Sequence, residues 1–288
     1  MPKTFHMVKP SGSQYSGPRS DAAGLLRIGD DSSRVTGTVR FDELDAARGV
    51  AILMMILFHT LFDLYYFTMY PVNVRDGFWR YFALATGSLF LFIAGLSLSV
   101  SHARAKRAYA GDVWAPARIA EKFLVRGAGI FLCGMLITVV TWVLVPQSFI
   151  IFGILHLIGI SIMISPLFFR FRERNILIGA AIFLAGILLW IPPLYGPFWL
   201  LWIGIHPASF STLDYYPLFP WLGVVLMGLG TGERIYPGGE RAFPTPRIPK
   251  PARIPLTFLG RHSLLVYLLH QPMILFILHV LTGDPLFW

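Results

Sequence analysis

The chain has 288 residues, of which 55% are hydrophobic and only 14% are charged. Soluble globular proteins average about 25% charged residues, so this composition excludes an ordinary soluble domain. The formal net charge of +9 would favour nucleic acid in a soluble protein, but here the basic residues lie beside hydrophobic runs. In that position they indicate membrane topology and anionic lipid headgroups. We therefore expect an integral membrane protein with the lipid bilayer, and no nucleic acid, as its partner.

The N-terminal part and the remainder of the chain differ sharply in composition. Residues 1–40 are rich in Ser, Gly, Pro, Asp and Arg without apolar periodicity, which predicts a disordered cytoplasmic tail. Residues 41–288 are predicted to form one transmembrane domain, because apolar runs of roughly 20 residues can cross the hydrocarbon core as helices. About seven spans are predicted, at 44–67, 78–100, 120–145, 148–169, 175–193, 217–232 and 256–281. The sixth is short and rich in glycine, so whether it fully crosses is left open.

Lysine and arginine indicate the orientation of the predicted bundle. With the tail inside and Arg48 counted with it, alternation through seven spans places every Lys and Arg on the cytoplasmic side except Arg75 and Arg80. The predicted fold class is therefore an all-α integral membrane protein with a cytoplasmic N-terminus and the C-terminus outside. Residues 1–40 lack the apolar core of a secretory signal, which favours a multi-pass protein of a prokaryotic plasma membrane.

The first predicted helix carries a stripe of four ionisable residues. Asp45, Arg48, His59 and Asp63 fall within an arc of about 60°. Ionisable residues in a spanning helix are costly and are by default a functional hypothesis. His59 and Asp63 are four residues apart, close enough for the carboxylate to bond the imidazole and prepare a general base. Asp45 and Arg48 fit a self-satisfied ion pair and a ligand-binding pair equally well.

Two further histidines are predicted at nearly the depth of His59. Counted from the cytoplasmic ends of their spans, His156 and His270 lie about 20 Å along their helices. Tyr267 and Gln271 share a face of the last helix with His270. The convergence predicts one buried polar site, slightly toward the outer leaflet. Two alternatives stay open: that each histidine bonds a neighbouring helix structurally, or that the three together ligate zinc.

The first helix also carries a family resemblance. LDAARGVAILMMILFHTLFDL resembles the first-helix signature of transmembrane acyltransferases related to heparan-alpha-glucosaminide N-acetyltransferase. Further matches follow in order: SLFLFIAGLSLSVS, FGILHLIGIS, DYYPLFPWLGVVLMGLG and GRHSLLVYLLHQP. The resemblance covers residues 41–281. It implies transfer of an acetyl or other acyl group from cytoplasmic acyl-CoA to an amine or hydroxyl of a sugar or glycolipid acceptor on the other side.

The resemblance also implies which residues form the site. The D-x-x-R-G motif maps onto Asp45, Arg48 and Gly49, and a polar position further along the helix maps onto His59. Family-3 sugar O-acyltransferases have a similar Arg-then-His first helix, which supports His59. The matching polar positions of the last helix are Tyr267, His270 and Gln271.

We therefore predict a membrane acyltransferase. His59, oriented by Asp63, would act as a general base or form an acyl-histidine intermediate. His270, Tyr267 or His156 would hold the thioester oxygen as charge develops on it.

The donor is expected to be acetyl-CoA or another acyl-CoA, and no metal is expected. Its phosphates would bind Arg48 and basic residues of the cytoplasmic loops, since cations make charge-assisted bonds to phosphate. The densest group is Arg104, Lys106, Arg107, Arg118, Lys122 and Arg126.

Two other functions stay open. One is a proton-coupled transporter in which His59, Asp63 and His270 form a relay. The other is a structural or assembly partner without chemistry, against which the buried polar stripe argues. The oligomeric state, including a homodimer, is also left open.

Overall fold

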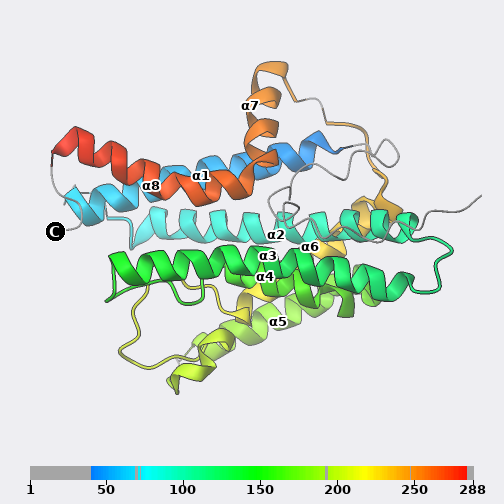
Figure 1. The fold of residues 1–288 in the computed structure, drawn as a ribbon, viewed down its shortest axis with the longest axis horizontal. Helices are drawn as coiled ribbons and strands as arrows, with labels where there is room; N and C mark the ends of the chain where they lie inside the picture. Colours follow the sequence, from blue (N-terminus) through cyan, green and yellow to red (C-terminus); the bar gives the residue numbers. More distant parts are fainter. Residues whose placement is uncertain (1–39, 69–70, 72, 192–193, 247, 284–288) are drawn as a thin grey trace, which may run out of the picture. The chain divides into compact units, whose positions relative to one another are not determined.

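The computed structural model describes residues 40–68, 71, 73–191, 194–246 and 248–283. The predicted N-terminal tail lies outside these ranges except for Arg40, and a compact unit begins at Phe41. Within the described ranges the regular structure is helical, and the only β-pairing consists of two isolated bridges. The α-helices are α1 (Asp42–Thr68), α2 (Gly77–Ala108), α3 (Ala115–Leu144), α4 (Ile154–Ile164), α5 (Asn175–Trp190), α6 (Leu218–Ile235), α7 (Lys250–Arg261) and α8 (Ser263–Thr282) (Figure 1). The 3-10 helices are η3 (Ser165–Leu167), η4 (Phe169–Arg174), η5 (Phe198–Ile203) and η6 (Pro237–Gly239).

Five helical segments are long and apolar enough to cross a membrane, which fits a multi-pass membrane protein. They are Asp42–Tyr66, Gly77–Ala108, Ala115–Leu144, Phe169–Trp190 and Ser263–Leu281. The all-helical membrane fold is thus confirmed for the described residues. The count of seven spans and the sidedness of the termini remain predictions.

The fourth predicted span is shorter than expected. Residues 148–153 form a turn and a bridge in place of helix, because Phe152 pairs with Tyr215. Helix α4 then begins at Ile154. It ends at Ile164, where Pro166 follows in the first turn of η3. Backbone carbonyls before α4 accept hydrogen bonds from the neighbouring segment, at Ser148 from Leu213 and at Phe152 from Tyr216, instead of continuing the helix.

The last predicted span is broken at His262. Residues before the break form α7, which runs across α1 and not along it (Figure 1). The two backbones touch, because a side chain at Gly49 would overlap the backbone of Leu256, and one at Gly260 would overlap that of Asp45. A straight helix through 256–281 could not make this crossing. Position along the final spanning helix is therefore counted from Ser263.

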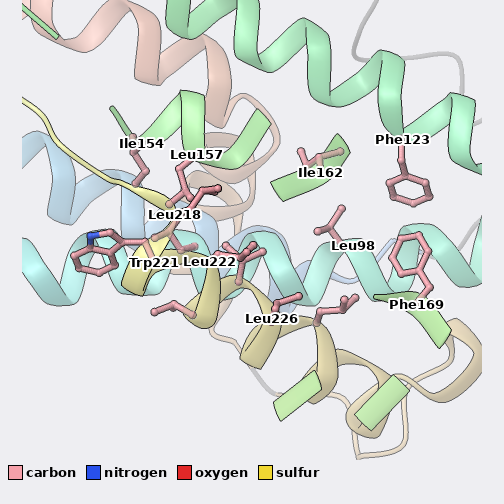
Figure 2. Packing of buried hydrophobic residues seen from close by; sticks show 14 of the residues in the cluster. Leu98, Phe123, Ile154, Leu157, Ile162, Phe169, Leu218, Trp221, Leu222 and Leu226 are labelled. Carbon is pink, nitrogen blue, oxygen red and sulfur yellow. The ribbon is translucent and has the colours of Figure 1, made fainter. Parts of the chain in front are cut away.

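Helix α6 lies at the centre of the bundle, between α2, α4 and α5. Its glycines are points of close backbone approach: a side chain at Gly228 would overlap the backbone of Phe92 in α2, and one at Gly223 would lie 2.5 Å from the carbonyl of Gly179 in α5. Small residues let membrane helices approach in this way. Figure 2 shows the apolar core around α6, where Leu222 and Leu226 lie among side chains from α2 and α4, and Phe123 of α3 lies further along beside Phe169.

Basic residues gather at one end of the bundle, which we call the basic end. It comprises the start of α1, the end of α2, the start of α3, η4, the end of α6 and α7. Ion pairs hold this end together: Arg241, in the connection after η6, binds Glu43 through two bonds of 2.7 Å, and Arg261 Nη2 of α7 lies 3.1 Å from Asp42 Oδ1 of α1. The long segment between α5 and α6 lies on the opposite side.

Candidate active site

Two histidines from different helices face one another inside the bundle. The ring centroids of His59 on α1 and His270 on α8 are 4.8 Å apart, with planes inclined by 74°. Each Nδ1 is hydrogen-bonded to a carbonyl of its own helix: His59 to Met55 at 2.9 Å and His270 to Tyr267 at 2.6 Å. A carbonyl can only accept, so each Nδ1 carries the proton and each Nε2 presents a lone pair. We call these two residues the histidine pair.

The Nε2 atom of His270 is buried and has no hydrogen-bond partner among the described residues. Buried polar atoms without a partner are uncommon in folded proteins, and each one calls for an explanation. The lone pair suits a ligand group that donates, such as a hydroxyl or an amine. The histidine pair is therefore the arrangement in this bundle best suited to proton transfer or nucleophilic attack.

Asp63 bonds α8 and not His59. Gln271 donates through Nε2 to both carboxylate oxygens of Asp63 at 2.8 Å. The bond predicted between Asp63 and His59 is replaced by the bond from His59 to Met55. Helical side chains lean toward the N-terminus, so the imidazole reaches the preceding turn more readily than the following one. Asp63 thus ties α1 to α8 one turn beyond the histidine pair.

The third predicted histidine, His156, uses both ring nitrogens within its own surroundings. The N–H of Gly153 donates to its Nδ1 at 3.2 Å, and its Nε2 lies 3.3 Å from Thr138 Oγ1 of α3. These contacts close the start of α4 and join it to α3, as is typical of a structural histidine. A binding role for His156 stays a prediction.

Beside His156 lies a carboxylate that sequence reasoning missed. Asp214 accepts the N–H of Ile154 through Oδ2 at 3.0 Å. Burial raises the pKa of Asp214 to about 6, although the bond from Ile154 acts in the opposite direction. Burial also raises the pKa of Tyr216, and the negative charge of Asp214 adds to that rise. The signal in the sequence was an aspartate among aromatic residues in the DYYP segment.

A small cavity connects this carboxylate to the last helix. Its volume is about 10 Å³, and Asp214, His156 and Tyr267 provide its polar lining. That is roughly the space that one water molecule needs. The ring of Tyr267 lies 5.4 Å from that of His270, so the cavity and the histidine pair are neighbours along α8.

At the basic end, Asp45 and Arg48 form the ion pair that their spacing allows. Arg48 donates to Asp45 at 2.7 Å through Nη1 and to Ser97 of α2 at 2.6 Å through Nη2. Asp45 also accepts a bond of 3.3 Å from Arg261. Asp45 thus links α1 to α7 through Arg261, and Arg48 links α1 to α2 through Ser97.

Three further cations gather near Arg48. Arg126 of α3 lies 3.4 Å from Ser101, one turn beyond Ser97 on α2. The charge of Arg48 acts on Arg126, and the charges of Arg126 and Arg104 act on Lys122. We call Arg48, Arg104, Lys122 and Arg126 the cation cluster. In the described ranges, no group of three or more His, Cys, Asp or Glu side chains is placed to hold a metal ion.

One comparison with known proteins identifies a family for this chain. The family model described as heparan-alpha-glucosaminide N-acetyltransferase, catalytic, matches residues 40–272. No curated protein and no solved structure matches the chain. The match covers most of the chain and includes the cation cluster, both members of the histidine pair and Gln271. Membership in this family implies acetyltransferase activity. The chain therefore belongs to the family of the heparan-alpha-glucosaminide N-acetyltransferase catalytic domain, and the resemblance seen in its sequence is confirmed.

Proposed function

We propose that this protein transfers an acetyl or other acyl group from acyl-CoA to an amine or hydroxyl of a sugar or glycolipid. The observation that carries the proposal is the histidine pair. Its two imidazole ring centroids lie 4.8 Å apart, and each ring presents an Nε2 lone pair. By the positive-inside rule the basic end faces the cytoplasm, where acyl-CoA is available.

The cation cluster is suited to the phosphates of the donor. Like charges brought together at a partly buried surface repel one another, and a polyanion relieves that repulsion. Ser97 and Ser101 add hydroxyl groups between the two arginines. From Arg48 to His59 is 11 residues, or about 16 Å along α1 at 1.5 Å per residue. Coenzyme A carries its phosphates and its thioester at opposite ends of an extended arm, so a donor lying along α1 brings the thioester to the histidine pair.

Two reaction courses use the histidine pair. In the direct course, one Nε2 takes the proton of the acceptor as its oxygen or nitrogen attacks the thioester carbonyl. The carbon–sulfur bond then breaks, and the proton passes to the departing thiolate. In the covalent course, one Nε2 attacks the thioester carbonyl, the carbon–sulfur bond breaks and the CoA thiolate leaves. The acceptor then attacks the acyl-imidazole while the other Nε2 takes its proton, and the bond between Nε2 and the acyl carbon breaks to free the histidine. Because His270 has no N–H to offer at Nε2, the phenol of Tyr267 is the better candidate for holding the thioester oxygen.

The proposal is tested by radiolabelled acetyl transfer with the purified protein in liposomes. Acetyl-CoA would be supplied at the basic end, with glucosamine and glucose as acceptors. Label in the sugar fraction is the expected result. Neither transfer nor binding of acetyl-CoA, together with proton-driven uptake of a solute without acyl-CoA, would favour the transporter alternative.

Loss of a cation from the cluster should weaken donor binding. We expect Arg126→Ala to raise the Kd for acetyl-CoA by about 10- to 100-fold, because a hydrogen bond to a charged group contributes about 1.5–3 kcal/mol. A thermal-shift titration in detergent, with ATP alongside acetyl-CoA, provides the measurement.

The matched control is Arg118→Ala, because Arg118 belongs to the basic group predicted from the sequence but lies outside the cation cluster. Arg118 lies on the same helix eight residues earlier, and its exposed side chain pairs with Asp112. Its replacement should leave the Kd for acetyl-CoA unchanged. An equal loss from both variants would mean that the loops attract the donor only by general charge.

A further inference from the structure

Asp214 is held in place by two chain segments that are joined through their backbones. The N–H of Leu213 donates to the carbonyl of Ser148 at 2.9 Å, and that of Tyr216 donates to Phe152 at 2.9 Å. The segment between α5 and α6 is thereby fixed against the turn that precedes α4. These connections lie on the side of the bundle opposite the basic end, so Asp214 approaches the interior from the side where an acceptor would arrive.

Two glycines make room for the polar side chains of Asp214 and Tyr216. A side chain at Gly153 would overlap the carboxylate of Asp214, and one at Gly87 of α2 would overlap the hydroxyl of Tyr216. The sequence therefore leaves space at the two positions where polar side chains of the α5–α6 segment enter the bundle.

The carboxylate has few partners of its own. Among the described residues, Ile154 supplies its hydrogen bond, and no lysine, arginine or histidine neutralises it. The titratable groups around it are Tyr216 on its own segment, His156 of α4 and Tyr267 of α8. Asp214 is partly buried, and placing a carboxylate there without a cation or several donors is costly. Such an arrangement is explained if a ligand supplies the donors.

The cavity connects this carboxylate to the proposed reaction centre. Tyr267 lines the cavity through its side chain, and its backbone carbonyl accepts the Nδ1–H of His270. The cavity has room for about one water molecule, which is also the size of a single hydroxyl or ammonium group. It suits one functional group of a sugar and not the whole ring.

We propose that the carboxylate of Asp214 binds a hydroxyl or ammonium group of the acceptor and holds it beside the histidine pair. Asp214 is then a positioning residue that selects acceptors with a hydrogen-bond donor, on the far side from the donor phosphates. This inference rests on the proposed acyltransferase function and names the residue that would bind the acceptor.

The test compares Asp214→Asn with the native protein, using acetyl-CoA and either glucosamine or glucose. Asparagine keeps an oxygen for the N–H of Ile154, so the fold is expected to survive. We expect the KM for the sugar to rise at least tenfold while the Kd for acetyl-CoA changes less than twofold. The two sugars differ only in an amine or hydroxyl at one carbon, so a larger loss with glucosamine identifies ammonium recognition and an equal loss identifies hydroxyl recognition.

The control is Asp76→Asn, which neutralises an exposed carboxylate just before α2 and should change neither constant. A native protein that binds acetyl-CoA and acetylates either sugar, with an unchanged KM in Asp214→Asn, would overturn this inference and leave the acyltransferase standing. A native protein that neither binds acetyl-CoA nor transfers its acetyl group would remove both.

The pH dependence of the KM for glucosamine distinguishes a binding role of Asp214 from a purely structural one. The native KM for glucosamine should rise as the pH falls through about 6, because the carboxylate of Asp214 becomes protonated and loses its charge. The Asp214→Asn variant should lack that rise. The same rise in both proteins would also contradict the proposal.

Discussion

Replacing His59 with alanine is expected to lower the rate of acyl transfer by about 10²–10⁴-fold, the usual contribution of a positioned acid or base. The substitution removes an Nε2 lone pair from the histidine pair and leaves the cation cluster intact. Transfer should therefore be lost while the Kd for acetyl-CoA stays near its native value. Single-turnover transfer and a thermal-shift titration on the same preparation measure the two effects separately.

The control for this experiment is His262→Ala. That histidine is exposed at the junction of α7 and α8, where its Nδ1 donates to the carbonyl of Phe258. The His262→Ala variant should keep native acyl-transfer activity. A folded His59→Ala protein with full activity would contradict the assignment.

The two reaction courses differ before any acceptor is added. In the covalent course, mixing protein with acetyl-CoA alone should release CoA and add one acetyl group to the protein, which intact mass spectrometry detects. His59→Ala and His270→Ala, measured side by side, would show which imidazole carries the group. In the direct course neither protein nor variant gains mass.

The second large effect concerns packing between α3 and α4. We expect Gly127→Ala to destabilise the fold by about 1–3 kcal/mol, the range for overpacking a well-packed interior. The added methyl group would lie 2.6 Å from the carbonyl of Gly159 and 2.6 Å from Cγ of Met163. Both helices would have to separate to admit it. Unfolding in mixed detergent micelles gives the free energy of unfolding.

Gly129 provides a control two residues along the same helix. A side chain there meets nothing within 4 Å. Gly129→Ala should be neutral or should stabilise by up to about 1 kcal/mol, since alanine favours helix over glycine. If both variants lose the same stability, helix flexibility and not the close contact with α4 explains the glycine at 127.

Long apolar runs made the helical membrane fold predictable, but they did not mark where tertiary contacts interrupt a helix. Ile254, Leu256 and Phe258 continue the hydropathy of the last span, so nothing local indicates the break at His262. The break depends on the crossing with α1, which brings together residues some 200 positions apart. In α6 the glycines left open whether the helix fully crosses, whereas Gly223 and Gly228 are close contacts with α5 and α2.

The candidate site was predictable where helical spacing controls it. His59 and His270 lie on the facing sides of α1 and α8, although the depth of His270 was counted from Leu256, across the break at His262. Their tautomers were not predictable, because these depend on backbone carbonyls one turn away. Asp214 was missed because it lies in a segment without periodicity, which reaches the start of α4 only through backbone bonds.

The crossing of α7 over α1 also has a consequence for how far each substrate must travel. Helix α7 exposes Ile254 and Phe258 beside Lys250 and Arg253, a combination typical of helices that lie at the membrane surface. From Ser263, where α8 turns inward, His270 is seven residues away, or about 10 Å at 1.5 Å per residue. The hydrocarbon core is about 30 Å thick, so the histidine pair would lie about a third of the way across, on the basic side of the midplane and not in the outer leaflet. The acceptor would then travel the remaining distance, about 20 Å, which favours a slender group that can reach deep into the bundle over a bulky glycan.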